Sequence, residues 1–337
     1  MQALTYTFVG LEDPLLPEVD RYLNAAHGAT IFHTSAWNRI VRDVFATQFM
    51  YAIALGSNGL AAVMPCHWVS VRRGMPVCYS PPSAYETPYG GPVGVDNAVC
   101  AELVRVASRR VLGGAVDVCA APPGSSWVKI GPWRRIVPAE TVYVDLTMPL
   151  DSIWTTSLDG KRRNMIRKAQ RAGVEIRAGG PELLDTYYTL VQQTVIRAGI
   201  ALHPIESYRR VVEVFGAAGL ALLLVAYVNG RAVSGGIFLR FRNSAYYWHG
   251  ATATGAPNEG QGELLQWQAI KWAHEAGCSV YDLVVIERNR LPHIARFKLG
   301  FSQNIVPFYS VVHTRSLDRV VRRLVRMTSE FSLQNRG

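Results

Sequence analysis

The chain has 337 residues, of which 49% are hydrophobic, and a formal net charge of +10 at pH 7. Because one hydrophobic core rarely keeps growing beyond about 250–300 residues, this length predicts two domains. No run of about 20 uncharged apolar residues occurs, which excludes a membrane-spanning segment, and the N-terminus lacks the basic-then-apolar order of a secretion signal. We therefore expect a cytoplasmic protein.

The five cysteines are scattered, with no C-x-x-C pair and no His at ligand spacing: Cys66, Cys78, Cys100, Cys119 and Cys278. Buried, reduced thiols are expected from this pattern. A zinc site or a disulfide framework is not, and no metal site is predicted.

The positive charge is concentrated in two segments. Residues 161–177 contain seven Lys or Arg and one Glu, and residues 315–326 contain five Arg and one Asp. Together they carry the whole positive excess, so the rest of the chain is balanced. RNA, a phosphate-bearing small molecule and an anionic membrane surface are the candidate partners.

The first half of the chain alternates strands and helices. Strands are predicted at 6–9, 50–55, 60–69, 115–120 and 141–146, and helices at 17–26, 36–45 and 98–112. Ser57-Asn58-Gly59 is a tight-turn signal that predicts a hairpin between two of these strands. Thr34 or Ser35 is the expected cap of the second helix.

A basic helix follows. Ser157 or Asp159 can cap its start, and Gly173 ends it. An apolar stripe of Met165, Ile166, Ala169 and Ala172 predicts packing on a core while the cations point elsewhere. Lys161, Arg162, Arg163 and Arg167 are the candidate donor or phosphate ligands, since cations near a helix N-terminus are poised to hold an anion. The alternative is a solvated helix that links two domains.

The second half repeats the order of the first about 170 residues later. Helices are predicted at 181–199, 205–215 and 263–276, and strands at 221–228, 232–240, 244–250, 279–285 and 306–313, with Asn229-Gly230 as the hairpin signal. This duplication predicts an α/β protein of two similar domains with mixed sheets, at 1–150 and 151–315. A basic amphipathic helix is predicted at 316–337, which either docks on its own protein or contacts anionic membrane or nucleic acid.

Two residues could carry chemistry. Lys298 lies between Phe297 and Gly300-Phe301, and an ammonium emerging from an apolar wall can stabilise an oxyanion or bind a phosphate. The alternative is a surface lysine whose stem packs on aromatic rings. His249 could act as a general base, or it could be a hydrogen-bonded structural histidine.

Five motifs together resemble the Fem family of aminoacyl-tRNA-dependent peptidyltransferases, which belongs with the wider set of GNAT-like acyltransferases. They are S-L-x-x-K-x-R-x-x-I-R-K-A-x-x-x-G at 157–173, Y-D-L at 281–283, F-K-x-G-F at 297–301, F-H-T-S-A-W-N at 32–38 and Y-G-G-P at 89–92. The resemblance implies two tandem GNAT-like domains. Because no heptad segment is present, the coiled-coil arm that many members carry is not expected.

The resemblance also implies roles for residues. Lys298 would polarise the acyl carbonyl or stabilise the tetrahedral oxyanion, and Phe297 would line the channel. The first domain would bind the acceptor through Trp37, Arg39 and Tyr89. The second would bind the donor and carry catalysis, and it offers Arg197, Tyr208, Tyr247 and His249 as substrate-binding residues. No Ser-His-Asp triad is expected, since the acyl group is already activated.

The loop before the helix 263–276 bears on the donor. Gly260 and Gly262 match the two glycines of the GNAT pyrophosphate loop, which cradles coenzyme A. Pro257 stands at its first position, and Glu259 and Glu263 place negative charge beside the expected phosphates. This favours aminoacyl-tRNA over acyl-CoA as donor.

Three functions follow from these observations. The first is amide formation, with an aminoacyl group moved from tRNA to the amine of a small molecule or peptide. The second keeps the fold and the chemistry but takes acyl-CoA as donor. The third is a non-enzymatic module that binds RNA or anionic lipid. No prosthetic group is expected in any of them.

Overall fold

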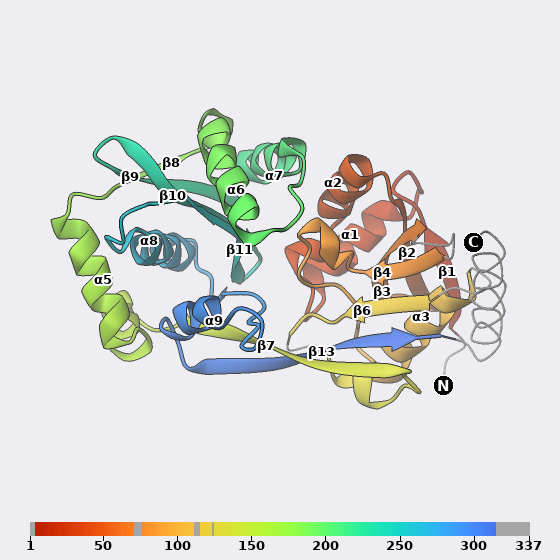
Figure 1. Cartoon of the computed structure of the whole chain (residues 1–337). Helices are drawn as coiled ribbons and strands as arrows, with labels where there is room; N and C mark the ends of the chain where they lie inside the picture. Colours follow the sequence, from red (N-terminus) through yellow and green to blue (C-terminus); the bar gives the residue numbers. More distant parts are fainter. Residues whose placement is uncertain (1–3, 71–75, 111–114, 123–124, 315–337) are drawn as a thin grey trace, which may run out of the picture. The chain divides into compact units, whose positions relative to one another are not determined.

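A computed structural model describes residues 4–70, 76–110, 115–122 and 125–314 (Figure 1). The helix predicted at 316–337 lies outside the described residues. The chain divides into two compact units. Unit 1 contains the residues up to Pro138 together with the described residues from Phe308, and unit 2 contains Ala139–Pro307.

Unit 1 is a mixed sheet with helices on both faces. Its elements are β1 (Thr5–Val9), α1 (Leu16–Ala25), α2 (Ser35–Phe45), β2 (Gln48–Gly56), β3 (Gly59–Ser70), β4 (Pro76–Ser80), β5 (Val93–Gly94), α3 (Asn97–Arg109) and β6 (Ala115–Cys119), with β13 (Asn304–His313) returning to it. The strand order is β1-β2-β3-β4-β6-β13, with β5 added on β3. Only the β4–β6 pair is parallel among the pairs described in this order.

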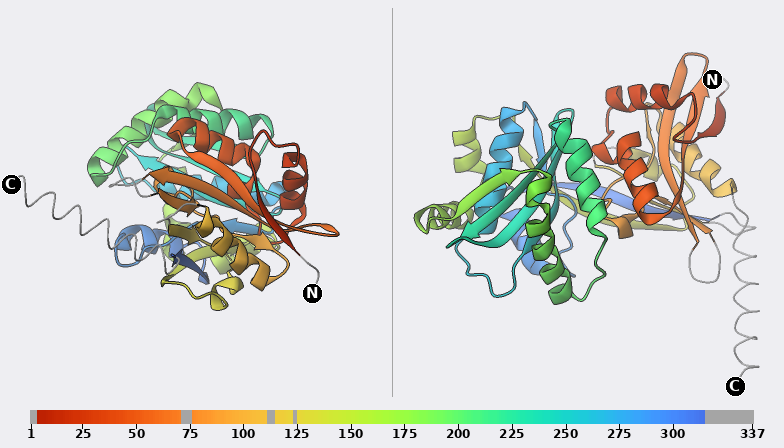
Figure 2. Two further views of the ribbon diagram at one scale, coloured as in Figure 1. Left: turned by 90° about the vertical axis from the view of Figure 1, so that its right-hand side faces the viewer. Right: turned by 90° about the horizontal axis from the view of Figure 1, so that it is seen from above.

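Unit 2 repeats this plan. Its elements are β7 (Arg135–Asp145), α4 (Leu150–Ser152), a π-helical turn (Ile153–Ser157), α5 (Gly160–Arg171), β8 (Glu175–Gly179), α6 (Leu184–Ala198), α7 (Ile205–Ala217), β9 (Ala221–Val228), β10 (Arg231–Phe241), β11 (Ser244–Thr252), α8 (Gln261–Glu275), β12 (Val280–Asp282) and α9 (Pro292–Leu299). The strand order is β8-β9-β10-β11-β12-β7. Helices α6 and α7 cover one face of the sheet and α8 the other (Figure 2).

The last strand of each unit comes from a distant part of the sequence. In unit 1, β6 pairs with β13, which comes from the end of the described chain. In unit 2, β12 pairs with β7, which follows β6 in the sequence. The boundary in the sequence therefore falls between Pro138 and Ala139 rather than at residue 150, and residues from Phe308 on belong to unit 1 rather than to a second domain ending at 315. The predicted α/β class is confirmed and the strands are mixed in direction, but they form one sheet rather than two.

Local turn chemistry accounts for the hairpins. Val228 pairs with Arg231, and Asn229 and Gly230 between them have φ of 49° and 74°. Positive φ at both central residues is a type I′ turn, whose twist matches that of the strands it joins. The predicted hairpin is therefore confirmed.

Helix lengths agree with an armless chain. The longest described helices, α6 and α8, have 15 residues each. Within the described ranges no helix is long and apolar enough to cross a membrane.

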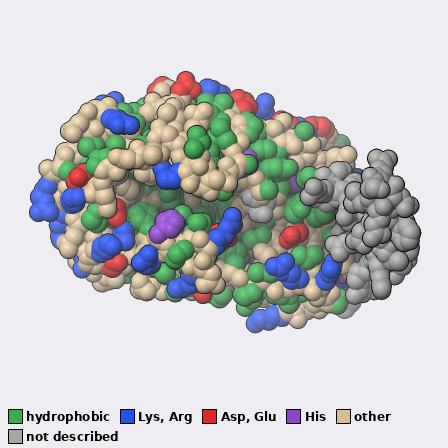
Figure 3. Space-filling view, in the orientation of Figure 1, with side chains coloured by type: hydrophobic (Ala, Val, Ile, Leu, Met, Phe, Trp, Pro, Cys, Tyr) green, Lys and Arg blue, Asp and Glu red, His purple; other side chains and the backbone are tan. Residues whose placement is uncertain are grey.

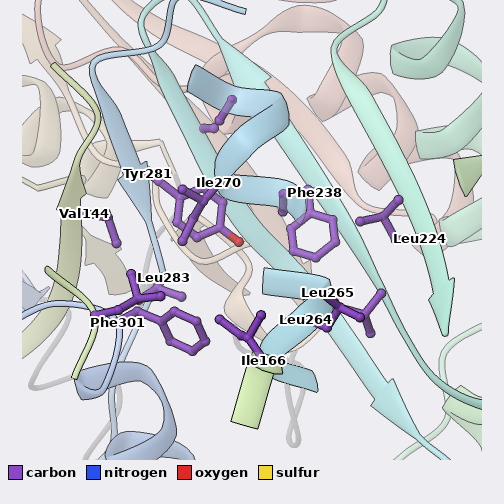
Figure 4. Packing of buried hydrophobic residues seen from close by; sticks show 14 of the residues in the cluster. Val144, Ile166, Leu224, Phe238, Leu264, Leu265, Ile270, Tyr281, Leu283 and Phe301 are labelled. Atoms are coloured by element: carbon purple, nitrogen blue, oxygen red, sulfur yellow. The ribbon is translucent and has the colours of Figure 1, made fainter. Parts of the chain in front are cut away.

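The core of unit 2 lies between its sheet, α5 and α8. Ile166 of α5 points toward Leu264 of α8 and Phe301, while Phe238 of β10 lies beside Leu265 (Figure 4). All five side chains are at most 4% exposed. Burial of these apolar side chains fixes α5 against the rest of the unit, which places its N-terminus next to α9.

Candidate active site

The sheet of unit 2 opens between β11 and β12. Only Ser244–Tyr246 of β11 pair with β12, in parallel, because β12 has just three residues. The strand predicted at 279–285 thus stops at Asp282. Among the described residues, no strand pairs with Tyr247–Thr252 on that side. We call this part of β11 the open edge.

In unit 1 the equivalent place is filled by the chain itself. Gly90 forms a bridge with Ala120, and its N–H donates to the carbonyl of Cys119 at 2.9 Å. A Cβ on Gly90 would lie 2.6 Å from the backbone N of Pro81. Gly90 therefore sits tightly against the ends of β4 and β6. We place the candidate site in unit 2 for this reason.

Replacing Gly90 is expected to destabilise the fold. Gly90→Val forces side-chain atoms into backbone that cannot yield, so the free energy of unfolding should fall by about 3 kcal/mol in a denaturant titration. Gly216→Ala in α7 is the control, because nothing lies within 4 Å of a Cβ there and the substitution should stabilise by up to about 1 kcal/mol. A Gly90→Val chain as stable as wild type would contradict this packing.

Lys298 is held by α9 beside the open edge. Lys298 is 7% exposed. Its Nζ donates to the carbonyl of Val285 at 2.9 Å and lies 5.8 Å from the centroid of the Tyr247 ring. Burial lowers the pKa of Lys298 to about 8, although the charges of Asp282 and Glu287 act in the opposite direction. A desolvated ammonium of this kind can stabilise a developing oxyanion.

Three of the predicted substrate-binding residues lie on β11 or against it. His249 Nδ1 lies 2.6 Å from the hydroxyl of Tyr187, and His249 Nε2 lies 3.5 Å from that of Tyr208. Burial raises the pKa of Tyr247 to about 12, and the Tyr247 hydroxyl reaches so close to Gly250 that a Cβ there would collide with it. His249 and Tyr208 therefore lie together on the side of the sheet that α6 and α7 cover. The register shift between Ile237 and Phe238 turns Tyr247 to the other face, where its ring stacks on that of Phe238 and lies near Lys298.

Sequence reasoning missed Tyr187. Its side chain is fully buried, and a Cβ on Gly235 of β10 would lie 2.8 Å from the Tyr187 ring. A glycine inside an apolar strand was the available signal, since it marks a close approach of another group.

Arg162 is buried instead of pointing to solvent. Its Nη1 lies 2.5 Å from Glu263 Oε1 of α8, and its guanidinium carbon lies 5.2 Å from the centroid of the Phe297 ring. A Cβ on Gly300 would collide with Arg162, and Asp159 N donates to the carbonyl of Gly300 at 2.9 Å. Residues of the basic-helix motif therefore pack directly against residues of the F-K-x-G-F motif. The charge of Arg162 is balanced inside the protein.

The other cations of α5 divide into two groups. Arg163 donates to carbonyls of the preceding turn, including those of Trp154, Thr155 and Leu158. Lys161, Arg167, Lys168 and Arg171 are exposed. Figure 3 shows Lys and Arg side chains gathered at the end of the view where α5 lies. Asp159 caps the helix, accepting from Arg162 N at 2.6 Å, as predicted.

The glycine loop before α8 is largely occupied by its own chain. Gln261 accepts from Glu259 N at 2.9 Å, and Lys168 Nζ donates to the carbonyl of Asn258 at 2.5 Å. Gly260 has φ of 84°, and a Cβ there would collide with Met165, so packing requires this glycine. A Cβ on Gly262 would meet Phe297 at 3.7 Å, an ordinary contact, so packing does not require that one.

The predicted residues of unit 1 do not share one surface. Trp37 and Tyr89 are buried, and both rings pack on Phe32; the Trp37 indole donates to Thr87 at 3.1 Å. Arg39 is half-exposed in an ion pair with Glu12 at 3.0 Å.

Arg197 of unit 2 lies at the end of β11. Its guanidinium donates to the carbonyl of Thr252 at 3.2 Å, and α6 thereby contacts the last residue of the open edge.

Comparison with known proteins agrees with this architecture. Residues 160–298 match the family described as acetyltransferase (GNAT) domain. The structure of FemX matches with a TM-score of 0.69 and 11% identity, over 95% of this chain and 99% of that chain. A tandem GNAT protein from the clavulanic acid biosynthesis pathway matches with a TM-score of 0.55 and 11% identity, over 92% and 98%. The chain thus contains a region that matches GNAT acetyltransferases, and its fold as a whole resembles that of FemX.

A further structure extends the comparison. The C-terminal domain of an Agrobacterium fabrum protein described as a putative lysylphosphatidylglycerol synthetase matches this chain with a TM-score of 0.56 and 14% identity, over 93% of this chain and 95% of that one. At these identities the likeness is one of fold. No curated protein sequence matches the chain. The GNAT match falls on unit 2 and includes α5, the glycine loop and Lys298.

Proposed function

We propose that the acyltransferase forms an amide by moving an aminoacyl group from aminoacyl-tRNA to the amine of a small-molecule or peptide acceptor. The observation that carries the proposal is the buried Lys298 ammonium beside the open edge of β11. Unit 2 binds the donor and carries the chemistry, while unit 1, whose equivalent opening Gly90 fills, contributes to acceptor binding.

The reaction balances without a protein nucleophile. The acceptor amine attacks the ester carbonyl, a C–N bond forms, and negative charge collects on the carbonyl oxygen. Lys298 stabilises that oxygen, and Phe297 keeps water away from the ammonium. The C–O bond to the ribose then breaks, and the leaving ribose oxygen takes the proton that the amine loses. Holding the amine and the activated ester together supplies much of the rate.

The exposed cations of α5 support a tRNA donor. Lys161, Arg167 and Arg171 lie along one helix and are suited to a phosphate backbone. The loop before α8 supports it too. The Glu259 N–H is already paired, and the Glu259 carboxylate lies 3.1 Å from Lys168 Nζ. This leaves the loop poorly suited to the diphosphate of coenzyme A.

The salt dependence of tRNA binding tests this surface. Replacing Lys161, Arg167 and Arg171 together by Gln should weaken binding and reduce the slope of log K against log salt by about one for each phosphate that is no longer neutralised. The matched control replaces Arg21, Lys129 and Arg134, exposed cations of unit 1, in the same way. Equal slopes for the two triple variants would exclude α5 as the docking surface.

Acyl-CoA remains the second candidate donor. The GNAT match and the opening between β11 and β12 favour it. The deciding experiment offers both donors to the enzyme with a panel of amines and measures amide product. Product from aminoacyl-tRNA alone supports the proposal, whereas product from acyl-CoA alone rejects the tRNA donor. Thermal shifts give a second readout, since a ligand at 100 times its Kd stabilises by about 2.7 kcal/mol.

A further inference from the structure

The chain bulges away from β7 shortly after β12. Leu283 N donates to the carbonyl of Val142 at 3.0 Å and Ile286 N donates to that of Glu140 at 2.9 Å, so both residues pair with β7. Val284 and Val285 lie between them and bulge out of this pairing. Val284 has φ of 52°, a left-handed conformation that is a clear outlier for a β-branched residue. Something must hold it there.

One carboxylate holds the bulge. Asp282 Oδ1 accepts from the Thr141 hydroxyl at 2.5 Å and from Val284 N at 2.7 Å. The Thr141 hydroxyl also lies 3.0 Å from the carbonyl of Val284. Asp282 and Thr141 are at most 1% exposed, so water competes little for these bonds. The backbone N–H and the carbonyl of Val284 are thereby both fixed.

The bulge aims a carbonyl at the lysine. The next residue, Val285, accepts the hydrogen bond from Lys298 Nζ at 2.9 Å. The charged and titratable groups that face this ammonium are Asp282 from β12, Glu287 from the following loop and Tyr247 from β11. Asp282 is buried, whereas Glu287 is exposed and screened by water.

We propose that Asp282 is a positioning residue of the site. With Thr141 it clamps the left-handed Val284, so that the Val285 carbonyl holds the Lys298 ammonium in place, and its buried negative charge keeps that ammonium protonated. The inference deepens the proposed function and rests on it for its catalytic meaning. The arrangement itself can be measured on Lys298 without any substrate.

Titration of the lysine side chains by NMR tests the charge. With ¹³C-lysine in the full chain, the Lys298 resonance is assigned by its absence from Lys298→Met. Asp282→Asn keeps an oxygen that can accept both bonds but removes the charge, so the midpoint for Lys298 should fall by about one unit, a tenfold decrease in proton affinity. Glu287→Gln makes the same charge change at an exposed position and should shift it by less than half as much. The proposal is overturned if the two variants shift the titration midpoint of Lys298 equally, or if Asp282→Asn does not shift it.

Thr141→Val tests whether the Thr141 hydroxyl and Asp282 together hold Val284. This test remains available if Asp282→Asn does not fold. It keeps the volume and the Asp282 charge but removes the hydroxyl. The Lys298 resonance should then collapse toward the position of freely rotating lysines. A Thr141→Val spectrum identical to that of wild type refutes the clamp.

Turnover separates this inference from the proposed function. If Lys298 stabilises the oxyanion, Asp282→Asn loses activity at neutral pH and regains it as the pH is lowered, while Lys298→Met shows no such recovery. If Lys298→Met keeps full turnover, the proposed function fails. The effect of Asp282→Asn on the titration of Lys298 does not depend on the turnover of Lys298→Met.

Discussion

Lys298→Met should lower turnover by about 10²–10³-fold, with little change in the affinity for the donor. Loss of one preformed oxyanion donor has an effect of this size, and methionine keeps most of the volume of the side chain. Single-turnover rates and donor binding, measured separately, check the expectation. Lys129→Met, an exposed lysine of unit 1, is the control and should leave both unchanged. A variant with unaltered turnover would remove Lys298 from the chemistry.

The pH dependence gives a second signature of the same residue. Burial lowers the pKa of Lys298 to about 8 from its ordinary 10.5. Activity should therefore fall as the pH rises through about 8, because the ammonium is lost. Stability should move the other way. Between about pH 8 and 10.5 the unfolded chain binds more protons at this lysine than the folded chain, so the free energy of unfolding rises with pH in this window. Lys298→Met should lack both effects.

Arg162→Met should lower the free energy of unfolding by about 3–5 kcal/mol. The ion pair with Glu263 is nearly buried, with side chains 8% and 11% exposed and a separation of 2.5 Å. Removing the cation leaves the Glu263 carboxylate buried without its counter-charge, which is strongly destabilising. Urea denaturation followed by circular dichroism provides the measurement.

Two controls isolate the pair. A double variant, Arg162→Met with Glu263→Leu, removes both charges and should recover more than half of the stability difference. Arg105→Met breaks a more exposed pair with Glu102, whose separation is 2.6 Å, and should change stability by no more than about 1 kcal/mol. If Arg162→Met and Arg105→Met lower the free energy of unfolding by similar amounts, burial of the Arg162–Glu263 pair does not account for the effect.

The burial of Arg162 also changes how the basic helix is tested. Charge reversal at Arg162 or Arg163 would disturb packing or the carbonyls of the preceding turn, and so would not report on ligand binding. The exposed residues Lys161, Arg167 and Arg171 are the ones that can be changed without this complication.

Signals confined to a few neighbouring residues were sufficient for much of the fold. The Asp159 cap, the end of α5 before Gly173 and the hairpin at Asn229-Gly230 all follow from short-range chemistry, and the structure confirms them. The repeated order of elements likewise revealed two similar units. Helix α9, which carries Lys298, was missed, because eight residues starting at a proline show too little periodicity.

The sequence by itself determined the class of the fold, the turns and the caps, since each depends on residues close together in the chain. Only the tertiary structure decided that β7 pairs with β12, that Arg162 contacts Glu263 and that Thr141 contacts Asp282. The reason is physical. Such partners lie more than 100 residues apart, and their pairing follows from which apolar faces are buried together. A cation on a helix therefore looks the same in sequence whether it faces water or a buried carboxylate.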